Sequence, residues 1–352
     1  MPESCRSTIA LVGDVMFLRR LDSFPSAQGA GFQQALARLR ESAVRVGNLE
    51  MPLSRRGSRQ PKHANLRADP ERATEVRALG FQGVTLANNH MMDYGAEALL
   101  DTLAACDAAG LRHCGAGSSL DAALDASWFE VGEQRVALLS VSSTLPPGSE
   151  ATEAGPGIAP IGVLMSFECD PNLLSEQPGT VPVVRTSARP LDRERVCERV
   201  RELSREADCV IVAIHWGVPG FWLSPSLGVL AEYQQPLGRA LIDAGADLIL
   251  GHHAHALHGI ERYRGKAICY SVGNFIFEDP RGFMEPEALI VEVRPRAGQA
   301  PELTLVPLLV DDAGLPRLAT GAEADRVFDL LSLLSAPFTT PLERRGDEMY
   351  LG

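Results

Sequence analysis

Two stretches of the sequence decide the fold class: Asp208-Cys-Val-Ile-Val-Ala-Ile-His-Trp-Gly217 and Ala246-Asp-Leu-Ile-Leu-Gly-His-His-Ala-His-Ala-Leu-His258. In each, a short apolar run leads directly into histidine, and a run of this length is typical of a buried strand. Open α/β sheets bind ligands at the carboxyl ends of their strands. We therefore expect an α/β protein in which four side chains meet at one edge of a sheet: His215, His252, His253 and His255.

The Gly-His-His-Ala-His cluster carries more weight than His215, because a single histidine on an apolar strand is usually a satisfied core residue. In an extended chain, alternate side chains point to the same side, as two ligands of one centre would. His253 and His255 therefore predict a polar or metal-binding site. The alternative is a solvated histidine loop.

Three further apolar segments also end in polar residues. Each of these segments has the composition of a short strand, so its polar residues should reach the same edge as the histidines. The candidates at these ends are Asp14 after 8–12, Asn48 and Glu50 after 43–46, and Asn88, Asn89 and His90 after 83–86.

The remaining patterns predict a mixed sheet with helices on its faces. Two segments around Gly132 read as an antiparallel pair, and the sheet is completed by 267–277, 288–293 and 303–309. Helical spacing occurs at 32–39, 69–79, 96–109, 191–206, 235–244 and 322–334. We expect one catalytic domain over 1–310, then a C-terminal helix and a tail over 311–352 whose last residues are frayed.

The segment 142–186 is rich in proline and glycine, which leaves little room for regular structure. A structureless loop of this length in a compact domain is usually functional or disordered. We interpret it as an insertion, with a lid as one role.

A net charge of −12 and a pI near 5.2 argue against nucleic acid or an anionic membrane as partner. A peptide substrate fits this charge better, and the oligomeric state stays open. Seven scattered cysteines without a Cys-x-x-Cys pair indicate a reducing compartment. With no apolar run of 18 residues and no basic leader, we expect a cytoplasmic protein.

Two loops offer substrate contacts, and each has an alternative interpretation. The basic loop, residues 54–67, carries Arg55, Arg56 and Arg59, which either bind an anionic group of the substrate or form a solvated surface. Trp216 and Trp222 either form a wall for an apolar group or pack against each other.

Taken in order, these motifs resemble the CapA family of poly-γ-glutamate capsule proteins, which have a calcineurin-like metallophosphoesterase fold. The resemblance covers roughly residues 8–280 and implies a four-layer α/β/β/α sandwich of mixed sheets. The matching motifs are Gly13-Asp14-Val-Met16, Asn48-Leu-Glu50, Asn88-Asn89-His90 with Asp93-Tyr-Gly95, His215-Trp-Gly217, Gly251-His-His253-Ala-His255 and Ser271-Val-Gly-Asn274.

The resemblance also implies roles. It makes His90 an acid or base, and it makes these residues metal ligands: Asp14, Glu50, Asn89, His215, His253 and His255. The chain departs from the phosphoesterase pattern at Met16, where a histidine would stand, and at Asn48 and Glu50, which replace Gly-Asp-x-x-Asp. Metal affinity depends on ligand number and charge, so we expect a single divalent ion at most and no required cofactor.

Members of the family without a membrane anchor include peptide epimerases, one of which inverts the C-terminal tryptophan of a ribosomal lasso-peptide precursor. Our leading hypothesis is accordingly a cofactor-independent L-to-D peptidyl epimerase. Its expected catalytic residues are Asp14, Glu50, His90 and His253, and Asn48 and Asn88 are expected to bind substrate. The alternatives are a metal-dependent phosphoester or amide hydrolase, and a non-catalytic peptide- or polymer-binding protein of poly-γ-glutamate synthesis.

Overall fold

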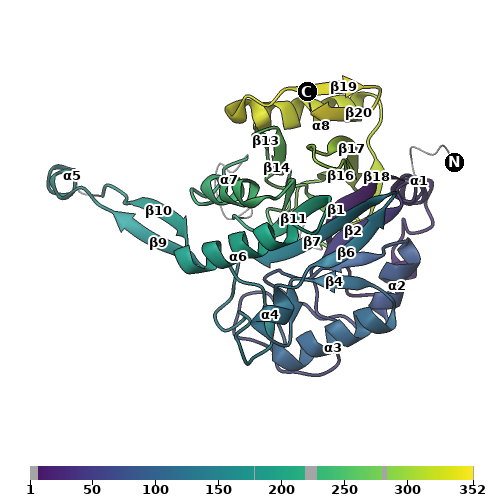
Figure 1. Ribbon diagram of the computed structural model, residues 1–352, viewed down its shortest axis with the longest axis horizontal. Helices are drawn as coiled ribbons and strands as arrows, with labels where there is room; N and C mark the ends of the chain where they lie inside the picture. The colour runs from purple at the N-terminus through teal and green to yellow at the C-terminus, as the bar shows by residue number, and fades with distance from the viewer. Residues whose placement is uncertain (1–6, 178, 219–227, 280–283, 352) are drawn as a thin grey trace.

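Two large mixed β-sheets lie at the centre of the molecule (Figure 1). The structure is a computed structural model that describes residues 7–177, 179–218, 228–279 and 284–351. In this part of the chain the larger sheet has ten strands, in the order β19 (Leu342–Arg345), β20 (Glu348–Leu351), β17 (Glu302–Val310), β16 (Glu287–Arg294), β1 (Ile9–Met16), β2 (Val44–Leu49), β3 (Gly83–Thr85) and β4 (Arg112–Cys114), with β15 (Asn274–Phe277) beside β1 and β18 (Pro316–Leu318) beside β17.

The smaller sheet has six strands among the described residues, in the order β13 (Ile260–Tyr263), β14 (Lys266–Cys269), β12 (Leu248–His252), β11 (Cys209–His215), β7 (Gln134–Ser142) and β6 (Ser127–Val131). Its middle strands are parallel, and β6 and β13 are antiparallel to their neighbours. The antiparallel pair expected around Gly132 is confirmed.

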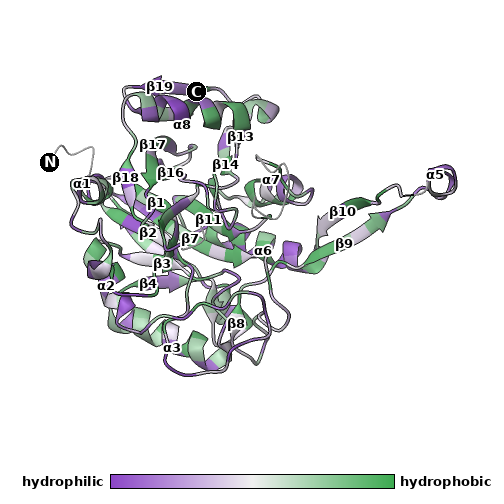
Figure 2. Ribbon diagram, turned by 180° about the vertical axis from the view of Figure 1, so that it is seen from behind, coloured by the Kyte–Doolittle hydropathy of each residue, from purple (hydrophilic) through white to green (hydrophobic). Residues whose placement is uncertain are grey.

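Three apolar interfaces separate four layers. Ile9 and Leu11 of β1 face the core between the two sheets, whereas Ala10 and Val12 face the core beneath the outer helices. On β11, Ile211 likewise faces the other sheet, and its neighbours face helices on the far side. A sheet covered on both faces needs nearly continuous apolar strands. This requirement explains the apolar runs in the sequence, whose hydrophobic residues are green in Figure 2.

The outer layers are helical. The larger sheet is covered by α1 (Ala30–Leu39), α2 (Arg72–Leu79) and α3 (Gly95–Ala108), and the smaller by α6 (Pro190–Leu203) and α7 (Gln234–Ala244). Helix α8 (Ala322–Ser335) packs into the core between the sheets through Val327 and Leu331. The expected four-layer α/β/β/α sandwich of mixed sheets is therefore confirmed.

Strand β1 changes partners in its middle, and this change creates the edge that holds the site. From Ile9 to Val12 it pairs with β16, and from Asp14 onward it pairs with β15 in parallel. A Cβ atom on Gly13 would lie 1.8 Å from the carbonyl oxygen of Gly273, so this crossing requires glycine. The exchange places Asp14 directly beside Asn274.

Three local expectations differ from the structure. The segment 142–186 is not structureless: it contains β8 (Gly157–Ile158), paired with β5 (Ala116–Gly117), and then an arm of β9 (Val163–Glu168), α5 (Pro171–Glu176) and β10 (Val183–Ala188). The arm projects from the body in Figures 1 and 2. Cross-strand pairing supplies order that a count of prolines and glycines does not reveal.

The other two differences concern strands. The segment up to Leu351 is not frayed, because β19 and β20 form a hairpin that extends the larger sheet. The strand expected over 267–277, with an interruption at Gly273 and Asn274, is two strands, β14 in the smaller sheet and β15 in the larger, so the chain crosses between the sheets here. No helix in the described part of the chain combines the length and apolar character needed to cross a bilayer.

Candidate functional site

A row of polar residues crosses the larger sheet near the carboxyl ends of β1, β2 and β3 and at the start of β15. Asn274, Asp14, Asn48 and Thr85 occupy neighbouring register positions on β15, β1, β2 and β3. The Asn48 amide donates to Asp14 Oδ1 at 2.8 Å, and the Thr85 hydroxyl donates to Asn48 Oδ1 at 3.2 Å. The predicted convergence of strand ends is therefore present within this sheet.

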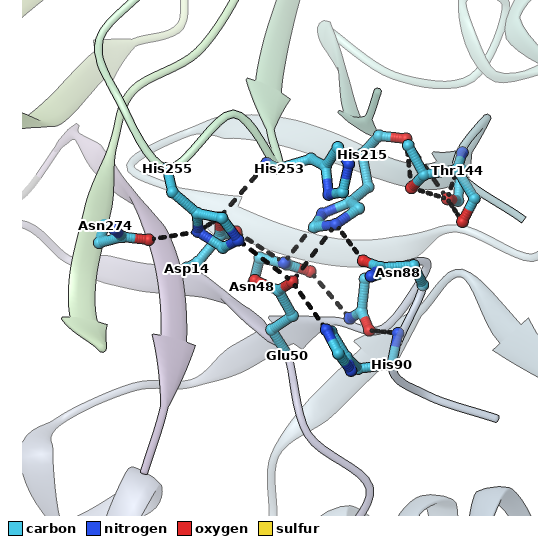
Figure 3. Close-up of polar contacts among 12 residues, drawn as sticks. Asp14, Asn48, Glu50, Asn88, His90, Thr144, His215, His253, His255 and Asn274 are labelled. Atoms are coloured by element: carbon cyan, nitrogen blue, oxygen red, sulfur yellow. Dashed lines mark hydrogen bonds and ion pairs between the residues drawn. The ribbon is translucent and has the colours of Figure 1, made fainter. Parts of the chain in front are cut away.

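Glu50, directly after β2, lies at the centre of the histidines contributed by the other elements (Figure 3). Its Oε1 is 3.5 Å from Nε2 of His215, and 3.9 Å from Nε2 of both His90 and His255. Both carboxylate oxygens of Glu50 are buried and lack a hydrogen-bond partner among the described residues. A buried carboxylate in this state is costly unless a cation or a proton compensates its charge.

The histidine loop after β12 reaches the site by a bend and not by strand alternation. His253 and His255 have φ values of 89° and 52°, in the left-handed region that non-glycine residues seldom adopt. The expectation that they share one side of an extended chain is wrong, although both side chains do enter the cluster. Backbone strain of this kind concentrates at functional sites.

The rings of this loop contact separate partners. His253 lies against His215 with ring centroids 4.6 Å apart, and its backbone N–H donates to Asp14 Oδ2. His255 Nδ1 is 2.9 Å from Asn274 Oδ1 and 3.5 Å from Asp14 Oδ2. His252, also expected in the cluster, contacts the backbone of the other sheet: its Nε2 lies 3.3 Å from the Val12 carbonyl oxygen. His252 therefore links the two sheets beneath the site.

His90 approaches Glu50 from the loop that follows β3. Its backbone N–H donates to Asn88 Oδ1, and its Nδ1 lies 2.7 Å from Asp93 Oδ2. Since a carboxylate only accepts, this contact assigns the proton to Nδ1 and leaves Nε2 facing Glu50. The arrangement fits an acid or base whose reactive nitrogen points into the cluster.

Burial sets the electrostatics of the cluster. Desolvation, followed by the nearby Glu50 carboxylate, raises the pKa of Asp14 to about 6. Burial and the neighbouring histidines lower the pKa values of His215 and His253 well below the usual range. These two rings are therefore neutral at pH 7, which is the form that binds metal.

The donors present fit a divalent metal ion. One ligand atom from each of Glu50, His215 and His253 lies within 4.8 Å of the others. Ligand atoms of Glu50, Asp14 and His255 form a second group within the same distance. Neutral imidazoles around an uncompensated carboxylate suit a first-row transition ion such as Zn²⁺ or Mn²⁺. Asn89, also expected as a ligand, lies beside this group, with its Oδ1 2.8 Å from His215 Nε2. Met16 packs into the helix-side core.

Three residues expected to bind substrate, Asn48, Asn88 and Trp216, already contact other parts of the protein. The Asn88 amide donates to the Leu49 carbonyl and to Asn48 Oδ1, so both asparagines already have partners within the protein. Trp216 is fully buried: its indole N–H donates to the Tyr270 carbonyl and its ring stacks on Tyr270. Trp216 therefore belongs to the core and not to a substrate wall. Trp222 lies outside the described residues.

Two arginines of the basic loop form ion pairs with surface carboxylates. Arg55 pairs with Asp69 and Glu71, and Arg56 pairs with Asp101. Arg59 is exposed. The structure thus places Arg55 and Arg56 in surface ion pairs, which are screened and contribute little to stability.

Sequence reasoning did not assign roles to Asp93, Lys62 and Asn274, all of which contact site residues. Asp93 could have been found, because it stands three residues after His90 in a segment with the composition of a turn. Lys62 is 28 residues from its partner His90 and has no comparable local signal.

His258, at the end of the same loop, provides a test of buried-histidine electrostatics outside the cluster. Burial lowers its pKa to about 4, from an ordinary value near 6.5. The folded state then binds fewer protons than the unfolded state, so stability is full above pH 6.5 and falls as the pH drops toward 4. Between pH 6.5 and pH 4, the free energy of unfolding measured with urea should fall by about 3 kcal/mol more in the wild type than in His258→Asn. Equal losses in the two proteins would contradict the depressed pKa.

Comparison with known proteins identifies the family to which this chain belongs. The profile of the bacterial capsule synthesis protein PGA_cap matches residues 8–279, which include every residue of the cluster. The chain belongs to the PGA_cap family. Among curated relatives, the capsule biosynthesis protein CapA of Bacillus anthracis is 29% identical over 337 residues, covering 94% of this chain and 74% of the relative.

A probable polyglutamine synthesis accessory protein of Mycobacterium tuberculosis is 30% identical over 328 residues, covering 90% of this PGA_cap chain and 79% of the relative. Among solved structures, a putative 5'-nucleotidase from Staphylococcus aureus in complex with alpha-ketoglutarate aligns with 92% of this chain at 15% identity and a TM-score of 0.45. This chain spans 58% of that structure.

Proposed function

We propose that this PGA_cap protein is an enzyme that inverts the α-carbon of a peptidyl residue, from L to D, by removing and returning a proton. The observation that carries the proposal is the placement of two acid/base groups around one buried carboxylate. Asp14 reaches the Glu50 group from β1, and His90 reaches it from the loop after β3. Inversion requires a proton to leave one face of the carbon and arrive at the other, which two such groups can provide.

Each side chain is held for this task by its neighbours. Asn48 and the His253 backbone N–H donate to the two oxygens of Asp14 and fix its plane. Asp93 fixes the His90 ring so that Nε2 faces the cluster. A divalent ion held by Glu50, His215 and His253 would act as a Lewis acid that stabilises the negative charge developing on the substrate carbonyl.

The substrate class we propose is a peptide or another polyamide chain. Supporting this choice, the names of the relatives refer to capsule and polyglutamine synthesis, and the acidic surface is unsuited to nucleic acid. We do not extend the proposal to a C-terminal tryptophan, because Trp216, which supported that reading, is buried in the core.

The test is incubation of the metal-supplemented protein with candidate peptides and short glutamate polymers in heavy water, followed by mass spectrometry and chiral amino-acid analysis. Epimerisation should add one deuterium per inverted residue and leave the chain length unchanged. Peptides that bind but gain neither deuterium nor a D-residue would contradict the proposal and favour a non-catalytic role in polymer synthesis.

A second candidate, metal-dependent hydrolysis of an amide or phosphoester, is favoured by a separate observation. Glu50 belongs to both ligand groups, so it would be a ligand of each ion if both groups held one. Paired ions can stabilise both the attacking and the leaving oxygen of a displacement. The same incubation identifies amide hydrolysis, which shortens the chain without adding deuterium at an α-carbon, and a parallel incubation with a phosphoester tests for release of phosphate.

A further inference from the structure

Lys62 stands apart from the other cations of the basic loop. It is one of two lysines among the 33 lysine and arginine residues of the sequence. Arg55 and Arg56 have mostly exposed side chains, but the Lys62 side chain is only 18% exposed and extends inward beneath the loop. Its ammonium group contacts the segment that carries His90.

The Lys62 ammonium joins three atoms around His90. It donates to Asp93 Oδ1 at 2.5 Å and to the Asn89 carbonyl oxygen at 2.6 Å, and it lies 3.5 Å from His90 Nδ1. The side chain of Asp93 is fully buried, so this ion pair compensates a carboxylate that would otherwise lack a counter-charge. The contact with Asn89 also fixes the peptide that leads into His90.

The loop is anchored so that Lys62 arrives at this position. The backbone N–H groups of Ser58 and Gln60 donate to the carbonyl oxygens of Tyr94 and Asp93, and the N–H of Leu66 donates to Asp93 Oδ2. Arg67 lies over the Tyr94 ring, 4.0 Å from its centroid. These contacts lie on both sides of Lys62 along the chain, so the loop wraps around the Asp93 turn.

We propose that Lys62 is a positioning residue of the site: through Asp93 and the Asn89 carbonyl it holds the His90 ring with Nδ1 protonated and Nε2 directed at Glu50. The basic loop then serves the site through its buried lysine, and its exposed arginines are surface residues. Lysine suits this place because an ammonium group has three donors that can point in different directions. The inference rests on the proposed function for its kinetic consequence, but not for the geometry of His90.

The first test does not require a substrate. Selective ¹⁵N-histidine labelling and long-range ¹H–¹⁵N correlation of the imidazoles should show His90 of the wild type as a single tautomer, with a proton on Nδ1. In Lys62→Met this signal should become a mixture of tautomers or broaden through ring motion. Lys266→Met is the matched control, because it removes the other lysine, which pairs with Asp247 away from the site.

Removing Lys62 leaves Asp93 without its counter-ion, so Lys62→Met can fail to fold. In that case the comparison uses Lys62→Gln, whose amide can still donate hydrogen bonds but carries no positive charge. A His90 spectrum identical to that of the wild type, in whichever variant is folded, would overturn the positioning role. A changed His90 signal with an unchanged Lys266→Met spectrum supports it.

The kinetic test separates this inference from the proposed function. With an inverted peptide in hand, Lys62→Met or Lys62→Gln should lower kcat by about 10- to 100-fold, the usual effect of losing a residue that orients a site side chain, with KM nearly unchanged. If His90 changes but no peptide is inverted by the wild type, the proposed function fails and the positioning role stands. If inversion occurs and both His90 and kcat are unaffected, the positioning role fails alone.

Discussion

The His90→Ala protein is expected to invert a peptidyl residue about 100 to 10,000 times more slowly than the wild type, the range by which a positioned acid or base accelerates proton transfer. The physical reason is the placement of His90 Nε2, 3.9 Å from Glu50 and directed into the cluster by Asp93. Chiral analysis of the product measures the rate. Asp14→Ala should show a loss in the same range.

Isotope exchange gives this prediction a sharper form. A variant that lacks only the group returning the proton keeps the group that removes it, so it should still exchange the α-proton for deuterium while losing inversion. We therefore expect exchange and inversion to separate in one of the two variants. His113→Ala is the matched control, since His113 pairs with Asp107 outside the cluster. Near-normal inversion in both His90→Ala and Asp14→Ala would reject this assignment of the site.

Glu50→Gln is expected to lower the affinity for a divalent ion by more than about 100-fold, because loss of a direct ligand should exceed the 10- to 100-fold effect of losing an outer contact. The substitution keeps the shape of the side chain but removes the negative charge at the centre of the cluster. Elemental analysis after dialysis against Zn²⁺ or Mn²⁺ measures the bound metal. The wild type should retain one ion per chain, and Glu50→Gln should retain almost none.

The matched control is Glu130→Gln, which changes an exposed glutamate on β6. Its metal content should equal that of the wild type. Equal metal content in Glu50→Gln and the wild type would remove Glu50 from the ligand set. Two retained ions per wild-type chain would contradict the single-ion expectation based on Met16, and would favour hydrolysis over inversion.

The positions of most site residues were predictable because these residues stand where an apolar run stops. A strand covered on both faces needs apolar side chains throughout, so a polar residue such as Asp14 or His215 marks the point where the chain reaches the edge of the sheet. The same runs indicated a mixed sheet with helices on its faces, and the resemblance to the CapA family implied the four-layer sandwich of two sheets. Repeated strand ends with acidic, amide and imidazole groups then predicted that these groups meet.

Contacts between distant segments could not be predicted in this way. The exchange of partners along β1 depends on the close approach of Gly13 to Gly273, which are 260 residues apart. The sequence alone left the side chain of Trp216 free to line a pocket, whereas packing against Tyr270 buries it. Such choices are settled by the competition among side chains for a limited core volume, which no local pattern encodes.

The sequence by itself determined the α/β class, the apolar strands and the residues at their ends, because these follow from local periodicity and from the chemistry of each side chain. Only the tertiary structure decided how those residues are oriented. The left-handed bend turns His253 and His255 inward, and the wrapped loop brings Lys62 to Asp93. Orientation depends on hydrogen bonds and packing between segments far apart in the chain, and these form when the whole domain has assembled.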